Sequence, residues 1–225
     1  MQQNLKQKGT NEMNERDFRN VKNRIFYKLV NTNLNQVAID NAPNVKIPKF
    51  GMSKLFYVYL DEDEMGATAL FVNNPIADIL GYSVEELEYY ADKNTFRLFP
   101  TTIKSLKDIM SELLGMSADT FINEEFDIDL YVLSNSFKTD GAHSMFNREF
   151  LNNFAERNSE KRLYLLPVSK HEVFVVLGSH IECERDLLKL KSLLYDLVSS
   201  DDIYDERLGY ECIIYDVETG EYSVA

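Results

Sequence analysis

The chain has 225 residues, 44% of them hydrophobic and 12% aromatic, which is enough to bury a sizeable core and excludes disorder of the whole chain. Its 37 acidic residues outnumber 24 basic ones, and the formal net charge of −13 repels nucleic-acid backbones and anionic lipid surfaces. We therefore expect neither direct nucleic-acid binding nor membrane association. Because no apolar run approaches the ~18 residues that span a bilayer and the polar N-terminus lacks a signal-peptide core, a cytoplasmic location is predicted.

The N-terminal part is predicted to contain a tail, a helix and a connector. Residues 1–14 are polar and are expected to form a disordered tail. Apolar residues at helical spacing then predict an amphipathic helix from Asp17 to about Val30. The Asn-rich connector after it is expected to include a short helical turn at Leu34 to Ile39.

A hairpin and a short helix are predicted next. Two strand-like runs, 54–60 and 66–72, flank the acidic sequence DEDEM, which predicts an antiparallel hairpin with its charges at the tip. Asn74 and Pro75 predict the start of a short helix, with the asparagine as N-cap, and Gly81 is suited to end it.

Two longer helices are predicted after this short one. Ser83 and Glu86 form a capping-box pattern, which predicts a helix that stops before Pro100. Apolar residues at helical spacing predict a second helix over about Thr102 to Leu114, with Gly115 as its C-cap.

The segment from 129 to 178 is predicted to form the centre of the sheet. It reads DLYVLSN, a helical run ending FLNNFAERN, and RLYLLPVSKHEVFVVLG, the pattern of a strand, a helix and two strands joined at PVSKHE. The acidic segment 116–129 before it is expected to be a surface loop. After it, leucines on one stripe of Glu184 to Val198 predict a helix, and Tyr210 to Asp216 with Glu221 to Val224 predict a terminal hairpin.

The predicted fold class is α+β, with a mixed, largely antiparallel sheet of about six to seven strands covered by five to six helices, because most consecutive strands are hairpin partners. We expect a single domain over residues 15–225, and the alternative is a division into sub-lobes 15–118 and 119–225. Cys183 and Cys212 do not resemble a disulfide framework, so both thiols are expected to be reduced and buried.

Several runs of the chain match a known family in order and spacing: RIFYKLVN (24–31), LFYVYLDEDEMGATALFVNN (55–74), NTFRLFP ending at Pro100, DLYVLSN with Gly141 and Ala142 downstream, and LYLLPVSKHEVFVV (163–176). On these runs the chain resembles the bacterial family of unknown function DUF5688, from about Asp17 to the C-terminus. Ser169, His171 and Glu172 fit the family pattern, whereas Val168 stands where the family has a second serine, and the family segment before the first run is usually longer. The resemblance implies a cytoplasmic bacterial α+β protein with no established activity, cofactor or substrate.

The turn PVSKHE is the one place where potentially catalytic groups gather. A histidine beside a carboxylate can act as a general base, so a hydrolase-like enzyme that uses Ser169, His171 and Glu172 is one hypothesis. Successive residues of a strand point to opposite faces, and for this reason Ser169 and His171 can face one substrate more readily than His171 and Glu172. A polar turn whose side chains bond to nearby backbone explains the same residues, and we favour that interpretation.

No cofactor and no metal site is predicted. His143, His171 and His180 are not spaced as paired metal ligands, with one another or with the two thiols. The sequence DEDEMG begins like a calcium loop, but Met65 and Val72 stand at positions that need oxygen ligands. The sequence also lacks a glycine-rich phosphate loop and a nucleophile elbow.

Three functions are considered. The first is a non-enzymatic protein-binding or regulatory module that presents a sheet edge or an acidic loop to an unknown protein partner. The second is the hydrolase described above. The third is an acidic nucleic-acid mimic that inhibits a nucleic-acid-binding protein, which requires the carboxylates at 61–64, 124–129 and 201–206 to converge on one face. The absence of a chemical motif beside a well-specified core favours the first, so an enzyme is not the expected outcome.

Overall fold

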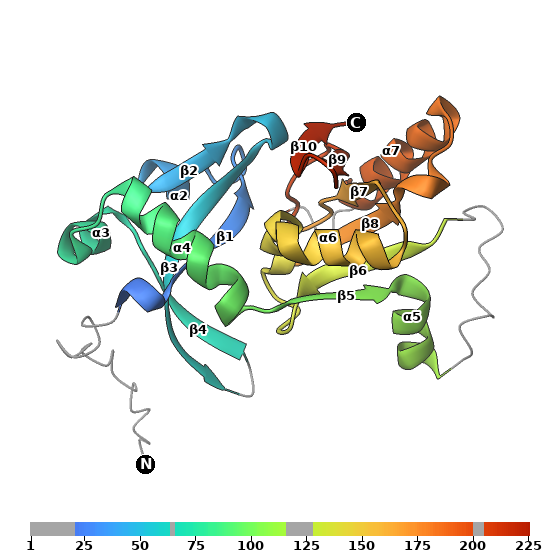
Figure 1. Ribbon diagram of the computed structural model, residues 1–225. Helices are drawn as coiled ribbons and strands as arrows, with labels where there is room; N and C mark the ends of the chain where they lie inside the picture. Colours follow the sequence, from blue (N-terminus) through green and yellow to red (C-terminus); the bar gives the residue numbers. More distant parts are fainter. Residues whose placement is uncertain (1–20, 64–65, 116–127, 200–204) are drawn as a thin grey trace, which may run out of the picture.

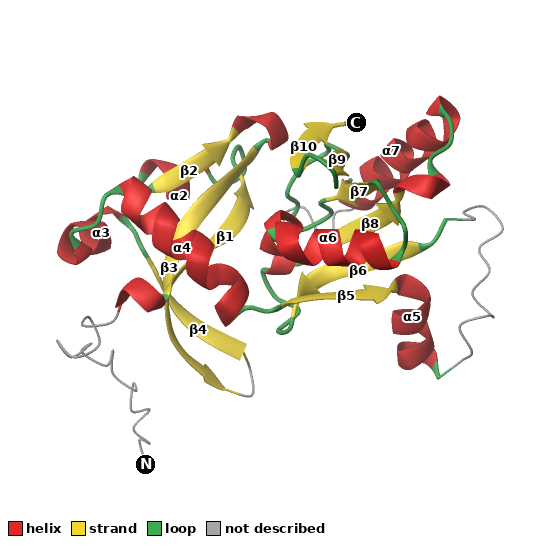
Figure 2. Ribbon diagram, in the orientation of Figure 1, coloured by secondary structure: helices red, strands yellow, loops and turns green. Residues whose placement is uncertain are grey.

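The computed structural model describes residues 21–63, 66–115, 128–199 and 205–225. Over these ranges the chain forms two antiparallel sheets, of four and six strands, which lie side by side with helices packed on each (Figure 1, Figure 2). The α+β class is therefore confirmed. The described strands number ten rather than six to seven, and they are divided between two sheets.

The four-stranded sheet is built around one long strand. β3 (Met52–Asp63) pairs antiparallel with β1 (Ile25–Asn31), β2 (Asn44–Ile47) and β4 (Gly66–Phe71). The β3–β4 pairing confirms the predicted hairpin. However, the strand β3 continues to Asp63, so its acidic residues begin within the strand and not only at the tip.

β1 corrects the prediction of a helix from Asp17 to Val30. Val21–Asn23 forms one 3-10 turn, η1, and β1 follows it as a strand, whereas residues 17–20 lie outside the described ranges. The helical spacing was misleading because Ile25 and Leu29, four residues apart, also lie on one face of a strand, together with Tyr27 between them. All three enter the same hydrophobic core, as the period of two in a strand requires.

Three helices accompany this sheet, and each confirms a prediction. α2 (Gln36–Asp40) is the expected short turn, and α3 (Asn74–Leu80) ends at Gly81, whose φ of 69° is left-handed. The N-cap of α3 is Asn73 rather than Asn74, since the Asn73 side chain accepts from the Ile76 N–H at 3.1 Å. α4 (Val84–Leu98) begins with the predicted capping box.

The helix α4 also closes part of the outer edge of β1. The Tyr27 N–H donates to Thr95 Oγ1 at 3.2 Å, and Asn94 Nδ2 donates to the Ile25 carbonyl at 3.0 Å. Both helix side chains are buried. Polar groups that an edge strand would otherwise leave unpaired are thus bonded to a helix.

The six-stranded sheet has the order β10-β9-β7-β8-β6-β5, with all neighbours antiparallel. The strands are β5 (Thr101–Ser105), β6 (Leu130–Asn135), β7 (Arg162–Leu166), β8 (Val173–Leu177), β9 (Ile213–Asp216) and β10 (Glu221–Val224). The pairs β7–β8 and β9–β10 confirm the central and terminal hairpins. β5 is the terminal strand at one side of this sheet (Figure 1).

Helices cover both faces of the six-stranded sheet. α6 (Arg148–Arg157) shares a core with Leu163 and Leu165 of β7, while α7 (Glu184–Val198) shares another with Tyr164 and Leu166. Alternate residues of the strand therefore face different helices. Short 3-10 turns, η2 (Pro48–Phe50), η4 (Gly141–Phe146) and η5 (Gly178–His180), join other elements.

α5 (Leu106–Leu114) corrects the prediction of a helix from Thr102 onward. Thr101–Ser105 is the strand β5, and the helix begins only after Ser105, whose hydroxyl accepts from the Asp108 N–H at 3.0 Å. The β-branched residues of this segment favour the strand, and the serine provides the N-cap. Gly115 ends the helix with a left-handed φ of 63°, as predicted.

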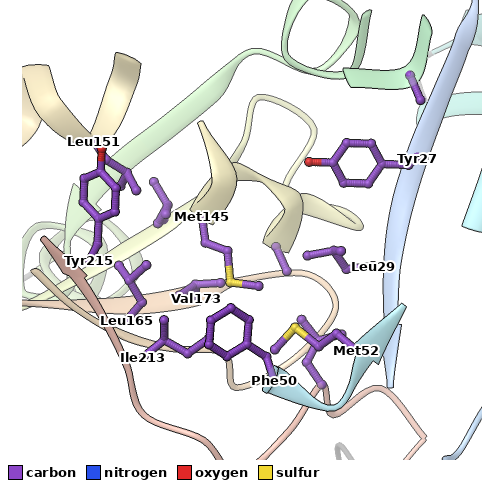
Figure 3. Close-up of a cluster of buried hydrophobic side chains, with 14 of the residues drawn as sticks. Tyr27, Leu29, Phe50, Met52, Met145, Leu151, Leu165, Val173, Ile213 and Tyr215 are labelled. Carbon is purple, nitrogen blue, oxygen red and sulfur yellow. The ribbon is translucent and has the colours of Figure 1, made fainter. Parts of the chain in front are cut away.

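A common core joins the two sheets. Figure 3 shows side chains of the four-stranded sheet and its connections, such as Leu29, Phe50 and Met52, in one cluster with Val173 and Ile213 of the six-stranded sheet. The chain passes from one sheet to the other between α4 and β5, and the single domain over 15–225 remains a prediction.

The two cysteines differ in their environment. Cys212 is buried, as predicted, and burial raises the pKa of its thiol to about 12. Cys183 is exposed, which corrects the prediction that both thiols are buried, because it is the N-cap of α7 rather than a core residue. Its backbone N–H donates to the Asp186 carboxylate at 3.1 Å.

Candidate functional site

The turn between β7 and β8 holds itself together through its own polar groups. Ser169 is 5% exposed, and its Oγ accepts from the His171 backbone N–H at 3.1 Å. The Ser169 N–H donates to the Glu172 carbonyl at 3.3 Å. The first of these is the side chain-to-backbone bond expected of a polar turn, and the second is a backbone bond that closes the turn.

The imidazole of His171 lies between two other segments of the chain. Its Nδ1 accepts from the Asp140 N–H at 3.0 Å, so the proton of the neutral ring is on Nε2. Nε2 is 3.1 Å from Glu206 Oε1. The hydrogen bond from His171 lowers the pKa of the Glu206 carboxyl, and Lys170, with Nζ 3.3 Å from the same oxygen, acts in the same direction.

Backbone hydrogen bonds fix the turn against the start of η4. The Gly141 N–H donates to the His171 carbonyl and the Ala142 N–H to the Lys170 carbonyl, each at 3.1 Å. The His171 carbonyl also accepts from Ser134 Oγ at 2.8 Å. A Cβ on Gly141 would lie 2.3 Å from Ser134 Oγ, so only glycine fits this approach.

The arrangement differs from what hydrolytic chemistry needs. A serine nucleophile requires its Oγ within hydrogen-bond reach of a base, whereas Ser169 Oγ accepts a backbone N–H and is buried. The His171 ring instead meets Glu206, a partner that sequence reasoning missed because it is 35 residues away in an acidic loop. The hydrolase using Ser169, His171 and Glu172 stays a prediction.

An ion pair near this turn links the two sheets. Lys28 Nζ of β1 is 2.6 Å from Asp140 Oδ2, and both side chains are mostly buried. Asp140 adopts a left-handed φ of 51°. Lys28 and Asp140 line both a hollow of about 250 Å³ and a smaller cavity of about 120 Å³.

The described residues include no group of three or more His, Cys, Asp or Glu side chains placed to hold a metal ion. His143 is buried, and Nδ1 of His180 accepts from the Asp129 N–H at 3.3 Å.

The three acidic segments are described only in part, because most of their residues lie outside the described ranges. Two carboxylates that are described make ion pairs: Asp129 is 2.5 Å from Lys107 Nζ, and Glu206 contacts Lys170. Nucleic-acid mimicry by these three segments stays a prediction.

Fold and candidate site together define an α+β protein of two antiparallel sheets, joined at a hydrogen-bonded turn and an ion pair. The model of a family of unknown function, DUF5688, matches residues 1–215 of the chain, and the chain therefore belongs to this family. The family expected from the sequence runs is thus confirmed. No curated protein and no solved structure gave a match. None of the helices in the described ranges has the length and apolar character needed to cross a membrane.

Proposed function

We propose that this protein is a cytoplasmic, non-enzymatic module that binds a protein partner at the outer edge of β5 and the adjoining helix α5. The observation that carries the proposal is that α5 buries none of its residues, although its sequence is apolar along one side. Leu113 is 73% exposed and Leu114 54% exposed. Apolar side chains grouped on a surface in this way are typical of interaction sites.

The backbone of β5 offers hydrogen bonds beside this helix. The Pro100 carbonyl accepts from the Ser136 N–H at 2.9 Å, and in an antiparallel pair this sets the alternation, so Thr102 and Lys104 bond to β6. Thr101 and Ile103 then direct their N–H and C=O groups outward. Within the described part of the chain no strand pairs with that side. An extended segment of a partner fits such an edge.

Strand and helix belong to one surface. Lys104 Nζ contacts Glu112 Oε1 at 2.8 Å, which holds the last turn of α5 beside β5. We therefore expect the partner segment to pair with the backbone of β5 and to place an apolar side chain against Leu113 or Leu114. Basic residues in the partner would suit the formal net charge of −13.

A site-specific photo-crosslinker tests this surface in native lysate. Placed at the exposed Thr102, the probe is expected to capture one discrete protein, whereas the same probe at Leu188, 60% exposed on α7, is expected to capture none. The double substitution Leu113→Asp and Leu114→Asp should abolish the adduct and, with the purified partner, raise Kd at least ~tenfold. Equal adducts at both positions, no adduct at Thr102, or an adduct that survives the double substitution would contradict the proposal.

A further inference from the structure

The helix α6 runs alongside β5 on one face of the six-stranded sheet (Figure 1). At the N-cap of the helix, Asn147 Nδ2 donates to Thr101 Oγ1, at the start of β5, at 3.0 Å. Two turns later the ring centroid of Phe154 lies 5.1 Å from that of Tyr131, the residue of β6 that pairs with Ser105. The helix rises about 10 Å between these contacts, which is comparable to the length of β5.

The two sides of α6 face opposite edges of this sheet. Asn152 Oδ1 accepts from the Tyr215 hydroxyl of β9 at 2.7 Å, so the side of the helix that carries Asn152 faces β9. Phe150 and Phe154 follow Asn147 by three and seven residues, the spacing that places side chains on one side of a helix. They therefore lie on the side that contacts β5.

Ile103, Phe150 and Phe154 form an apolar surface, the α6 surface, beside the outer edge of β5. All three side chains are half-buried and pack against the common core, which fixes their positions. Lys104, the next residue of β5, points to the other face and contacts Glu112 of α5. The outer edge of β5 thus has the α6 surface on one face and α5 on the other.

A strand that pairs with this edge must divide its side chains between the two faces. The residue directly opposite Ile103 points to the same face as Ile103, and its neighbours point to the face of α5. Every second residue of the strand therefore meets the α6 surface. A large aliphatic side chain there removes apolar area of Phe150 and Phe154 from water, whereas a polar one finds no hydrogen-bond partner on these apolar side chains.

The charges around β5 favour basic residues at the ends of such a strand. Lys104 Nζ is 2.8 Å from Glu112 Oε1, and a carboxylate compensates the second lysine as well. Lys107 Nζ is 2.5 Å from Asp129 Oδ1. Asp108 of α5 adds another exposed carboxylate, and the whole chain has a formal net charge of −13. A basic segment is therefore attracted to this edge, whereas an acidic one is repelled.

We infer that the partner segment is a β-strand with large aliphatic side chains at alternate positions, one of them opposite Ile103, and with basic residues at its ends. This inference rests on the proposed pairing with β5 and adds the kind of segment that the edge selects. The aliphatic side chains pack against Phe150 and Phe154. The residues between them face α5, where one of them meets Leu113 or Leu114.

Two synthetic peptides test this specificity on the full chain. The first has the sequence RTITITR with blocked ends, and the second, RTSTSTR, carries serine in place of both isoleucines. We expect the first to bind with a Kd at least ~fivefold lower than the second, because its isoleucines bury apolar area on the α6 surface. Amide exchange should show that the first peptide protects Thr101 and Ile103. Protection of these amides with equal affinity for the two peptides would overturn the inference and leave the pairing with β5 intact.

Substitutions on the two faces of β5 locate the isoleucines. Phe150→Ala should reduce the preference for the first peptide to below ~twofold, whereas the double substitution Leu113→Asp and Leu114→Asp should leave that ratio unchanged. Tyr195→Ala, at a 62% exposed aromatic residue of α7, is the matched control and should also leave the ratio unchanged. A preference that survives Phe150→Ala and is lost with the two leucines would place the isoleucines on α5 and contradict the inference.

A measurement on the wild type covers the case in which Phe150→Ala does not fold. With ¹³C-labelled isoleucine in the first peptide, isotope-filtered NMR should show contacts from its methyl groups to the ring protons of Phe150 or Phe154. Methyl contacts with α5 alone, or a first peptide that does not protect β5, would overturn the inference. In the second case the photo-crosslink at Thr102 decides whether the proposed binding at β5 fails as well.

Discussion

Substitution of Gly141 tests the close contact between the start of η4 and the turn at His171, because it should change the free energy of unfolding. In Gly141→Ala the new Cβ would lie 2.3 Å from Ser134 Oγ, 2.6 Å from the Asn135 nitrogen and 2.8 Å from the His171 carbonyl oxygen. Two of these three atoms are backbone and cannot simply rotate away. Because φ of Gly141 is not left-handed, the effect of alanine is steric and does not come from backbone strain.

The loss of unfolding free energy in Gly141→Ala depends on which groups the new Cβ pushes apart. Separating these groups breaks or lengthens the bonds of Ser134 Oγ and of the Gly141 N–H to the His171 carbonyl, each worth about 1 kcal/mol. Overpacking a tight interior site adds about 1–3 kcal/mol. We therefore expect Gly141→Ala to lower the free energy of unfolding by about 3–5 kcal/mol.

Urea denaturation of the variant and of a matched glycine substitution measures this loss. Gly209→Ala is the control, because its Cβ would meet nothing closer than the Phe50 carbonyl oxygen at 3.4 Å, and we expect it to lie within about 1 kcal/mol of the wild type. If Gly141→Ala unfolds at the same urea concentration as the control, the close approach of η4 to the turn is wrong.

Three further predictions concern buried and half-buried polar groups. Thr95→Val keeps the side-chain shape but leaves the Tyr27 N–H without its acceptor, so the free energy of unfolding in urea should fall by about 1–3 kcal/mol, and an unchanged midpoint would contradict the edge contact. The pKa of His143 is about 4 in the folded protein and 6.5 ordinarily, so the unfolded chain binds more protons between pH 4 and pH 6.5. The contribution of His143 to the free energy of unfolding should therefore fall by about 3 kcal/mol as pH drops from 7 to 4. Comparing wild type with His143→Phe isolates this slope, and equal slopes would refute it. Glu206→Gln removes the charge of a half-buried partner of His171, and we expect a loss of at most ~1 kcal/mol that shrinks in high salt; a loss that salt does not change would argue against an electrostatic contact.

Elements with a local signal could be predicted from the sequence. The leucine stripe of α7 and the capping box of α4 fix those helices through neighbouring residues alone, and both predictions are confirmed. The central hairpin was equally clear because β-branched and aromatic runs flank a polar turn.

Segments whose apolar residues are spaced in a way that fits both a helix and a strand could not be assigned from the sequence. Ile25 and Leu29 satisfy a helix and a strand alike, and only pairing with β3 decides between them. Similarly, the apolar spacing around Ile103 predicts that the helix α5 begins before Leu106, whereas Thr101–Ser105 is a strand that pairs with β6. Such decisions depend on strands distant in the chain.

The candidate site was predictable only in part. The turn around His171 stands out because its residue types are rare together, and its interpretation as a polar turn agrees with the bonds that Ser169 makes. Its partners Asp140 and Glu206 belong to separate loops that the fold brings together. His143 gave no sequence signal beyond its own identity, since its burial becomes evident only in the folded chain.

The most direct test of the proposed binding surface is hydrogen exchange of β5 with the partner captured at Thr102. Thr101 and Ile103 direct their amides outward in the free chain, so they should exchange quickly alone and become strongly protected in the complex. Protection of these two amides, with little change at the opposite edge strand β10, is the result that the proposal predicts. Unchanged exchange in β5, with protection elsewhere on the molecule, would contradict it.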